Sequence, residues 1–346
     1  MTNLLILGKG DTPYSDRNPQ RLFEHAQRAG FAVQRYDYHK ISTLHDFKGE
    51  RINIMFFFPY TFWNANCETP KDTGLYGTSA HAYRLLKNFF LNIRDEITHH
   101  FLGREVHFVI PPEYAALDRD KIETIEQLQR SGVPTTERIH YHCLQDVLEQ
   151  ITPERGIFIK CRYGAEGKGI TLLRDGQWRT NYRIDGNLLA NYGVYDRWPF
   201  TDITGRQALV KQLMENEVIV EREVLAPDLF HGKKFDARAY VVGKEAPHMF
   251  VRINDHEKVV TNFSQGAEVR HHPMTNLPQP YLEVLVTQGV KAAHAMHSQF
   301  MGVDMMFDGD ETQGRVVEVQ TFTDFPHIER FNLAEYLVHN KGNWFV

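Results

Sequence analysis

The sequence predicts a mixed α/β (α+β) protein, with a parallel α/β unit followed by two strand-rich α+β units. In the first third, short apolar runs alternate with amphipathic segments, the pattern of a parallel sheet covered by helices. After about residue 118, strands paired around glycine-containing turns dominate. The 346 residues, 42% of them hydrophobic, suffice for two or three domains with cores of their own. We place the predicted domains at 1–117, 118–220 and 221–346.

Composition and charge exclude several classes of protein. The 39 basic and 44 acidic residues give a net charge of −5, which does not favour nucleic-acid binding by bulk charge. The longest apolar stretch, 52–58, is far shorter than the ~20 residues that cross a bilayer. Cys67, Cys143 and Cys161 are odd in number and far apart, as is typical of a reducing compartment. We therefore expect a cytoplasmic protein that binds neither nucleic acid nor a membrane.

In the N-terminal unit we expect four strands, at 3–7, 31–36, 51–58 and 105–110. Asn18 followed by Pro19 predicts the start of the first helix, which Gly30 ends. Thr78 predicts the cap of a second helix, whose buried side chains recur at helical spacing: Tyr83, Leu86, Phe90 and Ile93. The aromatic run 56–63 ends a strand at the edge where open α/β sheets bind ligands. It either lines a pocket there or packs in the core.

The later units read as strands with few helices. Asp118 or Asp120 begins a helix that ends near Gly132. Strands at 156–160 and 170–173 enclose a glycine-rich turn. Segment 175–210 has many aromatics and little periodicity, which predicts a loop-rich lid. Further strands are expected at 218–224, 235–242, 248–253, 303–307 and 315–320, with a helix at 281–299.

The first motif that carries chemistry is the glycine-rich segment 158–170. A strand delivers Lys160, and a loop with Gly164, Gly167 and Gly169 follows. Glycines let a backbone lie close to phosphates and offer its N–H groups, and lysine adds a positive charge. The P-loop pattern GxxxxGK[ST] is absent. The segment alone therefore indicates either a phosphate-binding loop or an ordinary β-hairpin.

A second motif combines acids and bases on two strands. Glu221, at the end of an apolar strand, can accept hydrogen bonds from an adenine amino group or ribose hydroxyls. Asp236 and Arg238 alternate with apolar residues, so they share one face of their strand. That face looks either into a cleft or, as a surface ion pair on an edge strand, into solvent.

A third motif lies near the C-terminus. Asp304 opens one strand, and Glu318 and Gln320 share a face of the next. Two carboxylates and an amide oxygen suit Mg²⁺, and acids buried among valine and methionine are costly without a cation. The alternative is a hairpin with solvated acids. A zinc site is not expected at His140, His142 and Cys143, because no second ligand pair completes it.

In this order the three motifs resemble those of the ATP-grasp superfamily, over about 120–325. Segment 233–242 with Thr261 and Asn262 is similar to the tubulin-tyrosine-ligase branch and to the branch of ribosomal-protein-glutamate ligases and glutathione synthetases. The N-terminal strand, helix and strand, with Tyr14, also resemble the latter branch. The resemblance implies an ATP-grasp fold, in which two α+β subdomains sandwich ATP.

The resemblance also implies a role for each matching residue. ATP would contact Lys121, Lys160, Gly167, Lys168, Gly169, Glu221, Glu223, Val224, Lys234 and Asp236. Arg238 and Arg252 would neutralise the transferred phosphate, beside Asn262. Two Mg²⁺ ions, or Mn²⁺, would be held by Asp304, Glu318 and Gln320. The family's last metal ligand is usually asparagine, so Gln320 is expected to shift or weaken the second ion.

The implied activity is an ATP-dependent carboxylate–amine ligation through an acyl phosphate, which releases ADP and phosphate. The two substrates can be small molecules or peptides, and a carrier protein is a further candidate acceptor. His271 and His272 are either candidates for the base that accepts the amine proton or solvated loop residues. The alternatives are an ATP-grasp-like kinase acting on an alcohol, against which the absence of a dense basic cluster counts, and a non-catalytic ATP-binding module. The aromatic N-terminal unit also offers a surface for a homo-oligomer.

Overall fold

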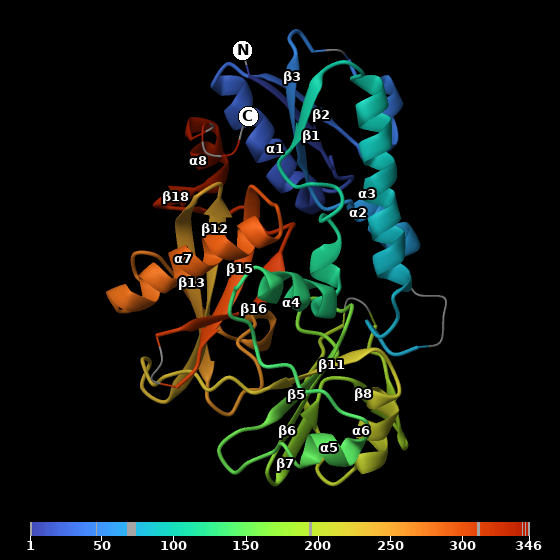
Figure 1. The fold of residues 1–346 in the computed structure, drawn as a ribbon, viewed down its shortest axis with the longest axis vertical. Coiled ribbons are helices and arrows are strands. Elements are labelled where there is room, and N and C mark those ends of the chain that lie inside the picture. The colour runs from blue at the N-terminus through green and yellow to red at the C-terminus, as the bar shows by residue number, and fades with distance from the viewer. Residues whose placement is uncertain are drawn as a thin grey trace.

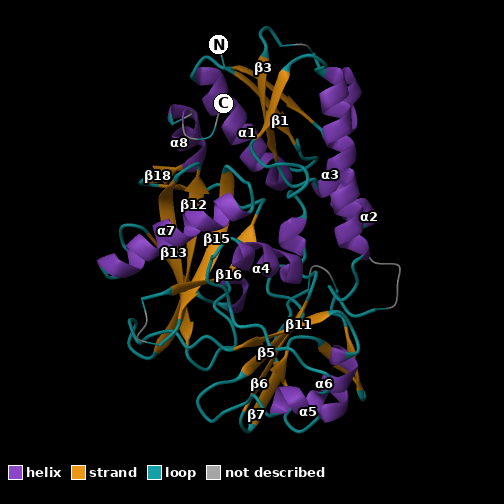
Figure 2. Ribbon diagram, viewed as in Figure 1, coloured by secondary structure: helices purple, strands orange, loops and turns teal. Residues whose placement is uncertain are grey.

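The computed structural model describes residues 2–45, 47–67, 74–193, 196–309, 312–340, 342 and 344, except for the side chain of Ser264. Three larger sheets follow one another along its long axis (Figure 1). The N-terminal sheet lies at one end and the second sheet, drawn in green and yellow, at the other. The third sheet lies between them, and Figure 2 shows loops and helix α4 where the second and third sheets meet.

The first sheet is parallel and buried. All five residues of its strand β1 are buried, and helices α1 and α3 flank the sheet (Figure 1). Parallel strands covered on both faces read as continuous apolar runs, which explains this segment of the sequence. The order is β2 (Ala32–Tyr36), β1 (Asn3–Leu7), β3 (Arg51–Phe56) and β4 (Glu105–Phe108). Its helices are α1 (Pro13–Arg28), η1 (Tyr38–Thr43), α2 (Tyr60–Asn66) and α3 (His81–His100).

The first helix begins earlier than predicted, at Pro13 rather than Pro19. The Thr12 hydroxyl accepts the backbone N–H of Ser15 at 3.1 Å, and the Ser15 hydroxyl accepts that of Thr12 at 3.2 Å. This reciprocal capping box satisfies two helix-end donors. Asn18 and Pro19 lie inside the helix. Both Thr-Pro and Asn-Pro start a helix well, and the sequence prediction chose the wrong pair.

Helix α3 presents the predicted inner face, but Thr78 is not its cap. Ala80 occupies the cap position without a side-chain hydrogen bond, and the Thr78 hydroxyl donates to the Leu75 carbonyl at 2.8 Å. The ring of Phe90 lies 5.3 Å from those of Phe56 and Phe322. Because Phe322 follows the last strand of the third sheet, these rings connect the first and third units. The buried residues of the helix are Tyr83, Leu86, Phe90, Ile93 and Ile97.

The second sheet is antiparallel and includes part of the segment predicted to be a lid. Its order is β10 (Thr201–Asp202), β7 (Gln177–Thr180), β6 (Ile170–Arg174), β5 (Ile157–Cys161) and β11 (Val218–Arg222). The prediction of a loop-rich lid at 175–210 is therefore wrong. Tyr182 and Trp198 are buried in the core of this unit, and strands of two to four residues leave no detectable periodicity. The segment also forms β8 (Arg183–Asp185), β9 (Leu188–Ala190) and the start of α6 (Gln207–Met214).

Helix α4 (Lys121–Arg130) lies where the second and third sheets meet (Figure 1). Asp120 is its cap, as one of the two predicted candidates, because its carboxylate accepts the backbone N–H groups of Ile122 and Glu123 at 3.1 and 3.2 Å. A carboxylate there also complements the positive end of the helix dipole. The neighbouring short elements are η2 (Leu117–Arg119) and α5 (Leu144–Leu148).

The third sheet is antiparallel and packs against helix α7 (Gln279–Ala295). Its order is β14 (Glu268–His271), β13 (Glu245–Asp255), β12 (Lys233–Val242), β15 (Phe300–Phe307) and β16 (Gly314–Gln320). The register of β15 and β16 shifts just after Asp304. The face of this sheet that does not contact α7 borders the second sheet at one end and packs with the core of the first unit at the other. A short helical turn, η3 (Phe263–Gln265), precedes β14.

The C-terminal segment returns to the first unit, which the sequence did not indicate. The hairpin of β17 (His327–Ile328) and β18 (Phe331–Asn332) leads into α8 (Leu333–His339), which lies beside α1. Leu333 and Leu337 join the core of the first sheet. The domain boundaries given above stay a prediction. Among the described residues, no helix combines the length and the apolar character that a membrane span needs.

Candidate functional site

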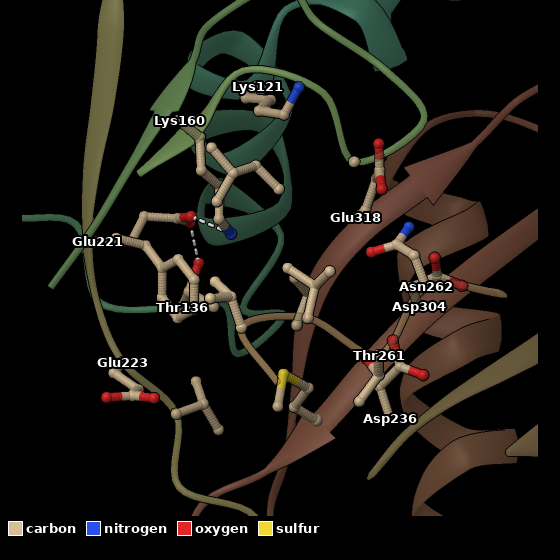
Figure 3. Close-up of a pocket in the computed structure, with 18 of the residues that line it drawn as sticks. Lys121, Thr136, Lys160, Glu221, Glu223, Asp236, Thr261, Asn262, Asp304 and Glu318 are labelled. Carbon is tan, nitrogen blue, oxygen red and sulfur yellow. Dashed lines mark hydrogen bonds and ion pairs between the residues drawn. The ribbon is translucent and has the colours of Figure 1, made fainter. Parts of the chain in front are cut away.

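A cavity lies between the second and third sheets and is called the first cavity below. Strands β5, β6 and β11 form one wall, strands β12, β13, β15 and β16 the other, and the glycine-rich loop after β5 borders it (Figure 3). Most of the predicted site residues line it: Lys121, Lys160, Gly167, Lys168, Glu221, Glu223, Val224, Lys234, Asp236, Arg252, Asn262, Asp304 and Glu318. Three others do not: Arg238, Gly169 and Gln320. The sequence motifs, up to 160 residues apart, thus meet in one place.

One end of the first cavity carries a buried lysine–glutamate pair. The Lys160 ammonium lies 2.6 Å from the Glu221 carboxylate, whose side chain is 3% exposed. The Thr136 hydroxyl donates to the same carboxylate, as the dashed lines of Figure 3 show. The two residues face each other because β5 and β11 are paired antiparallel neighbours. This end offers one cation and one acceptor held in fixed positions.

Glu223 lines the first cavity, but its carboxylate is already engaged. It accepts from the Arg174 guanidinium, with Nε at 3.0 Å, and from the backbone N–H of Gly156 at 2.9 Å. A carboxylate satisfied in this way has little capacity left for a ligand. The contribution of this segment to a ligand would therefore come from its backbone and from Val224.

The opposite wall carries two arginines and two aspartates in a buried network. Arg238 binds Asp304 with two hydrogen bonds of 2.6 and 2.8 Å, and Arg252 binds Asp236 with two of 2.7 and 2.5 Å. Arg252 also donates to Asp304 at 3.0 Å. Each bidentate pair joins directly opposite residues of neighbouring strands, the arrangement in which cross-strand pairs interact best. Asp236 thus faces the first cavity, whereas Arg238 on the same face of the strand is buried beside it and does not line it.

The charges of this network fix the ionisation of Asp304. Burial alone would raise its pKa, but the guanidinium groups of Arg238 and Arg252 lower the pKa of Asp304 to about 2. The carboxylate is therefore ionised at neutral pH although its side chain is 4% exposed. The two hydrogen bonds from Arg238 also fix the orientation of the Asp304 carboxylate.

Glu318 is the register partner of Asp304 across β15 and β16 and lines the same cavity. Figure 3 shows both carboxylates on the wall that also carries Asn262. Hard carboxylate oxygens suit Mg²⁺, so the donor set fits that ion, although it would share Asp304 with the two arginines. Gln320 lines the neighbouring cavity instead. Among the described residues, no group of three or more histidine, cysteine, aspartate or glutamate side chains is placed to hold a metal.

The glycine-rich loop has a backbone that ordinary residues rarely adopt. Gly167 and Gly169 have φ angles of 69° and 70°. A Cβ atom on Gly167 would lie 3.0–3.1 Å from the side chain of Asn262, so glycine permits this close approach. Lys121 donates to the Gly164 carbonyl, and the Asn181 side chain donates to the Gly167 carbonyl at 2.7 Å. The loop is thus held against both walls of the first cavity.

Lys234 lines the same cavity from β12. Its ammonium group donates to the Lys258 carbonyl. Burial, with a smaller contribution from the charge of Arg174, lowers the pKa of Lys234 to about 8. This lysine therefore exchanges its proton close to physiological pH, which the sequence gave no way to foresee.

A second cavity, of about 300 Å³, adjoins the first and shares Ala165, Lys168 and Glu318 with it. Its other walls come from the aromatic segment after β3 and from the residues around Gln320. Phe58, Tyr60 and Trp63 line it, while the preceding phenylalanines pack in the core. The aromatic run 56–63 thus serves both of the roles that the sequence left open.

Sequence reasoning missed some residues of these cavities and proposed others that lie elsewhere. Thr136 and Arg119 line the first and second cavity, yet neither belongs to a recognisable motif. His271 bonds to His248 at 3.0 Å, and neither His271 nor His272 lines either cavity. Their suggested role as a base therefore has no support from the geometry.

Comparisons with known proteins relate this architecture to one group of solved structures. The ATP-grasp ligase PsnB, solved with a phosphomimetic variant of its minimal precursor, Mg and ADP, matches with a TM-score of 0.58 at 14% identity, over 98% of this chain and 97% of that one. The D-cycloserine synthetase DcsG matches with a TM-score of 0.55 at 12% identity, over 97% and 98%. The macrocyclase MdnC from Microcystis aeruginosa, bound to its precursor peptide MdnA, matches with a TM-score of 0.55 at 12% identity, over 98% of both chains.

No protein-family model and no curated protein sequence matches the chain. The structural matches extend over almost its whole length, including the parallel N-terminal sheet. The chain therefore has the ATP-grasp fold, as the three sequence motifs implied. At these low identities the likeness defines the fold, and the chemistry has to be argued from the residues of this chain.

Proposed function

We propose that the protein is an ATP-dependent carboxylate–amine ligase that releases ADP and phosphate. A carboxylate oxygen attacks the γ-phosphorus, and the bond from that phosphorus to the bridging oxygen of ADP breaks. The amine nitrogen then attacks the acyl carbon, a C–N bond forms, and phosphate leaves with the former carboxylate oxygen. The amine proton passes to solvent or to the departing phosphate.

One observation carries this proposal above the others. The first cavity brings together a glycine-rich loop of the kind that binds phosphate, four partly buried lysines and two facing carboxylates, and a second cavity adjoins it. Acyl-phosphate chemistry needs no nucleophile from the protein, only positioning and stabilisation of spread negative charge. The arrangement supplies both. The γ-phosphate of ATP in the first cavity and the carboxylate of the acid in the second would meet at Lys168 and Glu318, which line both cavities.

The residues divide the work by position. Glu221 and Val224 would contact the nucleoside end, while Lys121, Lys160, Lys168 and the loop N–H groups would contact phosphate oxygens. Arg252 and Asn262 would orient the transferred phosphate, and Arg238 would act only by holding Asp304. Asp304 and Glu318 fit Mg²⁺, which neutralises phosphate charge when bound. Gln320, lying in the second cavity, would contact the substrate rather than this ion.

The alternatives predict different contents for the second cavity. A kinase for a phosphorylated alcohol would need a cluster of cations there. Carboxylates instead accompany the basic groups in its lining: Asp118, Glu166, Glu318 and Asp324. A non-catalytic ATP-binding module is supported only by Gln320, which stands where the family usually has an asparagine metal ligand. PsnB and MdnC were both solved with precursor peptides bound, which supports a peptide as one class of substrate to be tested here.

The test is ADP release across a panel of amino acids and short peptides, with hydroxylamine as the amine. Release that depends on the acid, together with hydroxamate formation, is the expected result. Glu318→Ala is the control, since it removes a carboxylate that lines both cavities without touching the arginine network. ADP release without a hydroxamate from any acid would contradict the ligase, and phosphate on an alcohol product would indicate the kinase.

Location and assembly stay predictions. Cys67, Cys143 and Cys161 are all free thiols, in keeping with the reducing compartment inferred from their number. Sedimentation of the purified protein and the location of a tagged copy would test the cytoplasmic and oligomeric predictions directly.

A further inference from the structure

Arg119 differs from the other arginines near the site. Arg238, Arg252 and Arg162 each bind a carboxylate through two nitrogens at distances of 2.5–2.8 Å. Among the residues that the structure describes, the Arg119 guanidinium donates no hydrogen bond, and its Nε atom is buried without a partner. The carboxylate of Asp118 lies 3.6 Å from this Nε atom. A guanidinium has five donors, so most of its capacity is unused.

Aromatic rings hold this guanidinium in place. It lies over the ring of Phe58 at 5.3 Å and over that of Trp63 at 5.6 Å, measured to the ring centroids. Cation–π contacts orient a guanidinium but leave its in-plane N–H groups for a planar acceptor such as a carboxylate. Its side chain is 18% exposed and lines the second cavity. Arg119 is thus a preorganised cation facing that cavity.

Asp118 is a poor competitor for these donors. One of its oxygens accepts the backbone N–H of Thr321 at 3.0 Å, and burial raises the pKa of its carboxyl group. The contact of 3.6 Å with Arg119 exceeds hydrogen-bond length. A ligand carboxylate that forms two direct hydrogen bonds would therefore gain more from Arg119 than Asp118 does.

The rest of the second cavity defines the body of its ligand. Tyr60, Trp63 and Phe322 supply aromatic walls, and the volume of about 300 Å³ lies at the small end of ligand sites. The exposed carboxylate of Asp324 opposes a second anionic group on that side. We infer that the second cavity binds a carboxylic acid with an apolar or aromatic body, and that Arg119 anchors its carboxylate. This inference deepens the ligase proposal and rests on it for the identification of the bound acid as a substrate.

Binding of small probes tests the inference without any turnover. Acetate, 3-phenylpropionate, L-leucine, L-phenylalanine and L-phenylalaninamide would be titrated calorimetrically into the full chain, without nucleotide and with a non-hydrolysable ATP analogue. We expect 3-phenylpropionate and L-phenylalanine to bind at least about tenfold more tightly than acetate, which lacks the ring contacts, and than the amide, which lacks the charge-assisted pair. Equal affinity for L-phenylalanine and its amide would overturn the inference.

The matched variants are Arg119→Gln and Arg130→Gln. Arg130 is an exposed arginine of α4 that lines neither cavity. Arg119→Gln should weaken the aromatic acids about tenfold to a hundredfold, with Arg119→Lys recovering part of the loss, while Arg130→Gln changes nothing. Arg119→Gln should also raise the KM of the acid and leave that of ATP within about twofold. Identical behaviour of the two glutamine variants would overturn the role of Arg119.

Two further outcomes separate this inference from the ligase proposal. Tight binding of the aromatic acids without acid-dependent ADP release would leave the inference standing and remove the ligase. Acid-dependent ADP release that ignores Arg119→Gln would leave the ligase standing and remove the inference. Tightest binding of inositol hexakisphosphate, as a polyanionic probe, would overturn the assigned ligand class.

Discussion

The two neighbouring cavities differ in how their charges are satisfied. In the first cavity the arginines and Lys160 already bind carboxylates at 2.5–3.0 Å. In the second, Arg119 has no hydrogen-bond partner among the described residues. A cavity whose charges are balanced accepts a ligand that brings its own counter-ions, as a magnesium triphosphate does. In the second cavity the unused donors of Arg119 are available to one carboxylate, so under the proposal the nucleotide and the acid would contact different cations.

The largest effect is expected from Asp304→Asn. It leaves Arg238 and part of Arg252 without a counter-charge in a buried network, which typically costs about 3–5 kcal/mol of folding stability. Asp324→Asn is the matched control, because this aspartate lies 4.0 Å from the same arginine with a side chain 64% exposed, so a loss below about 1 kcal/mol is expected. Urea unfolding measures both. Equal losses would show that the first cavity is not organised by this network.

Substitution of Lys160 tests whether its ion pair with Glu221 and its contribution to ATP affinity can be separated. Lys160→Met leaves the Glu221 carboxylate buried with only the Thr136 hydroxyl, so we expect a stability loss of about 2–3 kcal/mol. The double variant Lys160→Met, Glu221→Gln should regain most of that stability, because the unpaired charge is gone. Its ATP affinity should nevertheless stay about tenfold or more below wild type, measured by calorimetry. Recovery of affinity along with stability would contradict a direct role for Lys160.

Lys234 gives the first cavity a dependence on pH. Its pKa is lowered to about 8 in the folded protein, so ATP affinity should fall about tenfold between pH 7 and pH 9 as the ammonium charge is lost. Folding stability should change in the opposite sense. The unfolded chain keeps this proton until its pKa of 10.5, so it binds more protons between pH 8 and 10.5, and stability rises there.

Lys234→Met serves as the control for both measurements. It should bind ATP more weakly at pH 7 and show a flat affinity up to pH 9. A wild-type affinity that does not change over this range would place Lys234 outside the nucleotide contact. The affinity of the second cavity for acids should stay the same over this range, because the proposed anchor Arg119 carries a guanidinium, which does not titrate there.

The smallest effect concerns the loop that borders the two cavities. Gly167→Ala and Gly176→Ala both place alanine at a positive φ, of 69° and 66°, which costs about 1–2 kcal/mol in each case. Only the Gly167 variant brings a Cβ atom to within 3.0–3.1 Å of Asn262, whereas the space around Gly176 is open. We therefore expect a loss of kcat/KM of about fivefold for Gly167→Ala alone, at similar stability of the two variants. Equal kcat/KM values would show that the loop does not need this close approach.

The fold and most residues of the first cavity could be predicted from the sequence, because each motif lies within a short stretch of the chain. Asp236 and Arg238 alternate on one strand, and Glu318 follows the same rule on another, so each motif fixes its own face. The order of the motifs then implied the fold, and the fold placed them together. The helix start at Pro13 was missed because two proline-containing caps compete within a few residues.

The second cavity could not be predicted, because its parts come from distant segments without periodicity or motif. Arg119 becomes notable only from the structure, in which Phe58 and Trp63 lie against its guanidinium and its Nε atom has no hydrogen-bond partner among the described residues. The engagement of Glu223 by Arg174 is equally invisible in the sequence. The segment 175–210 misled the prediction because its strands are too short for a pattern to appear.

The most direct test of the ligase follows an oxygen atom. The purified protein would be incubated with ATP, an amine and the preferred acid labelled with ¹⁸O in its carboxylate, and the released phosphate analysed by mass spectrometry. If the carboxylate attacks the γ-phosphorus, one ¹⁸O atom is delivered to each phosphate released. Acid-dependent phosphate that carries no ¹⁸O, or phosphate retained on an organic product, would contradict the proposed chemistry.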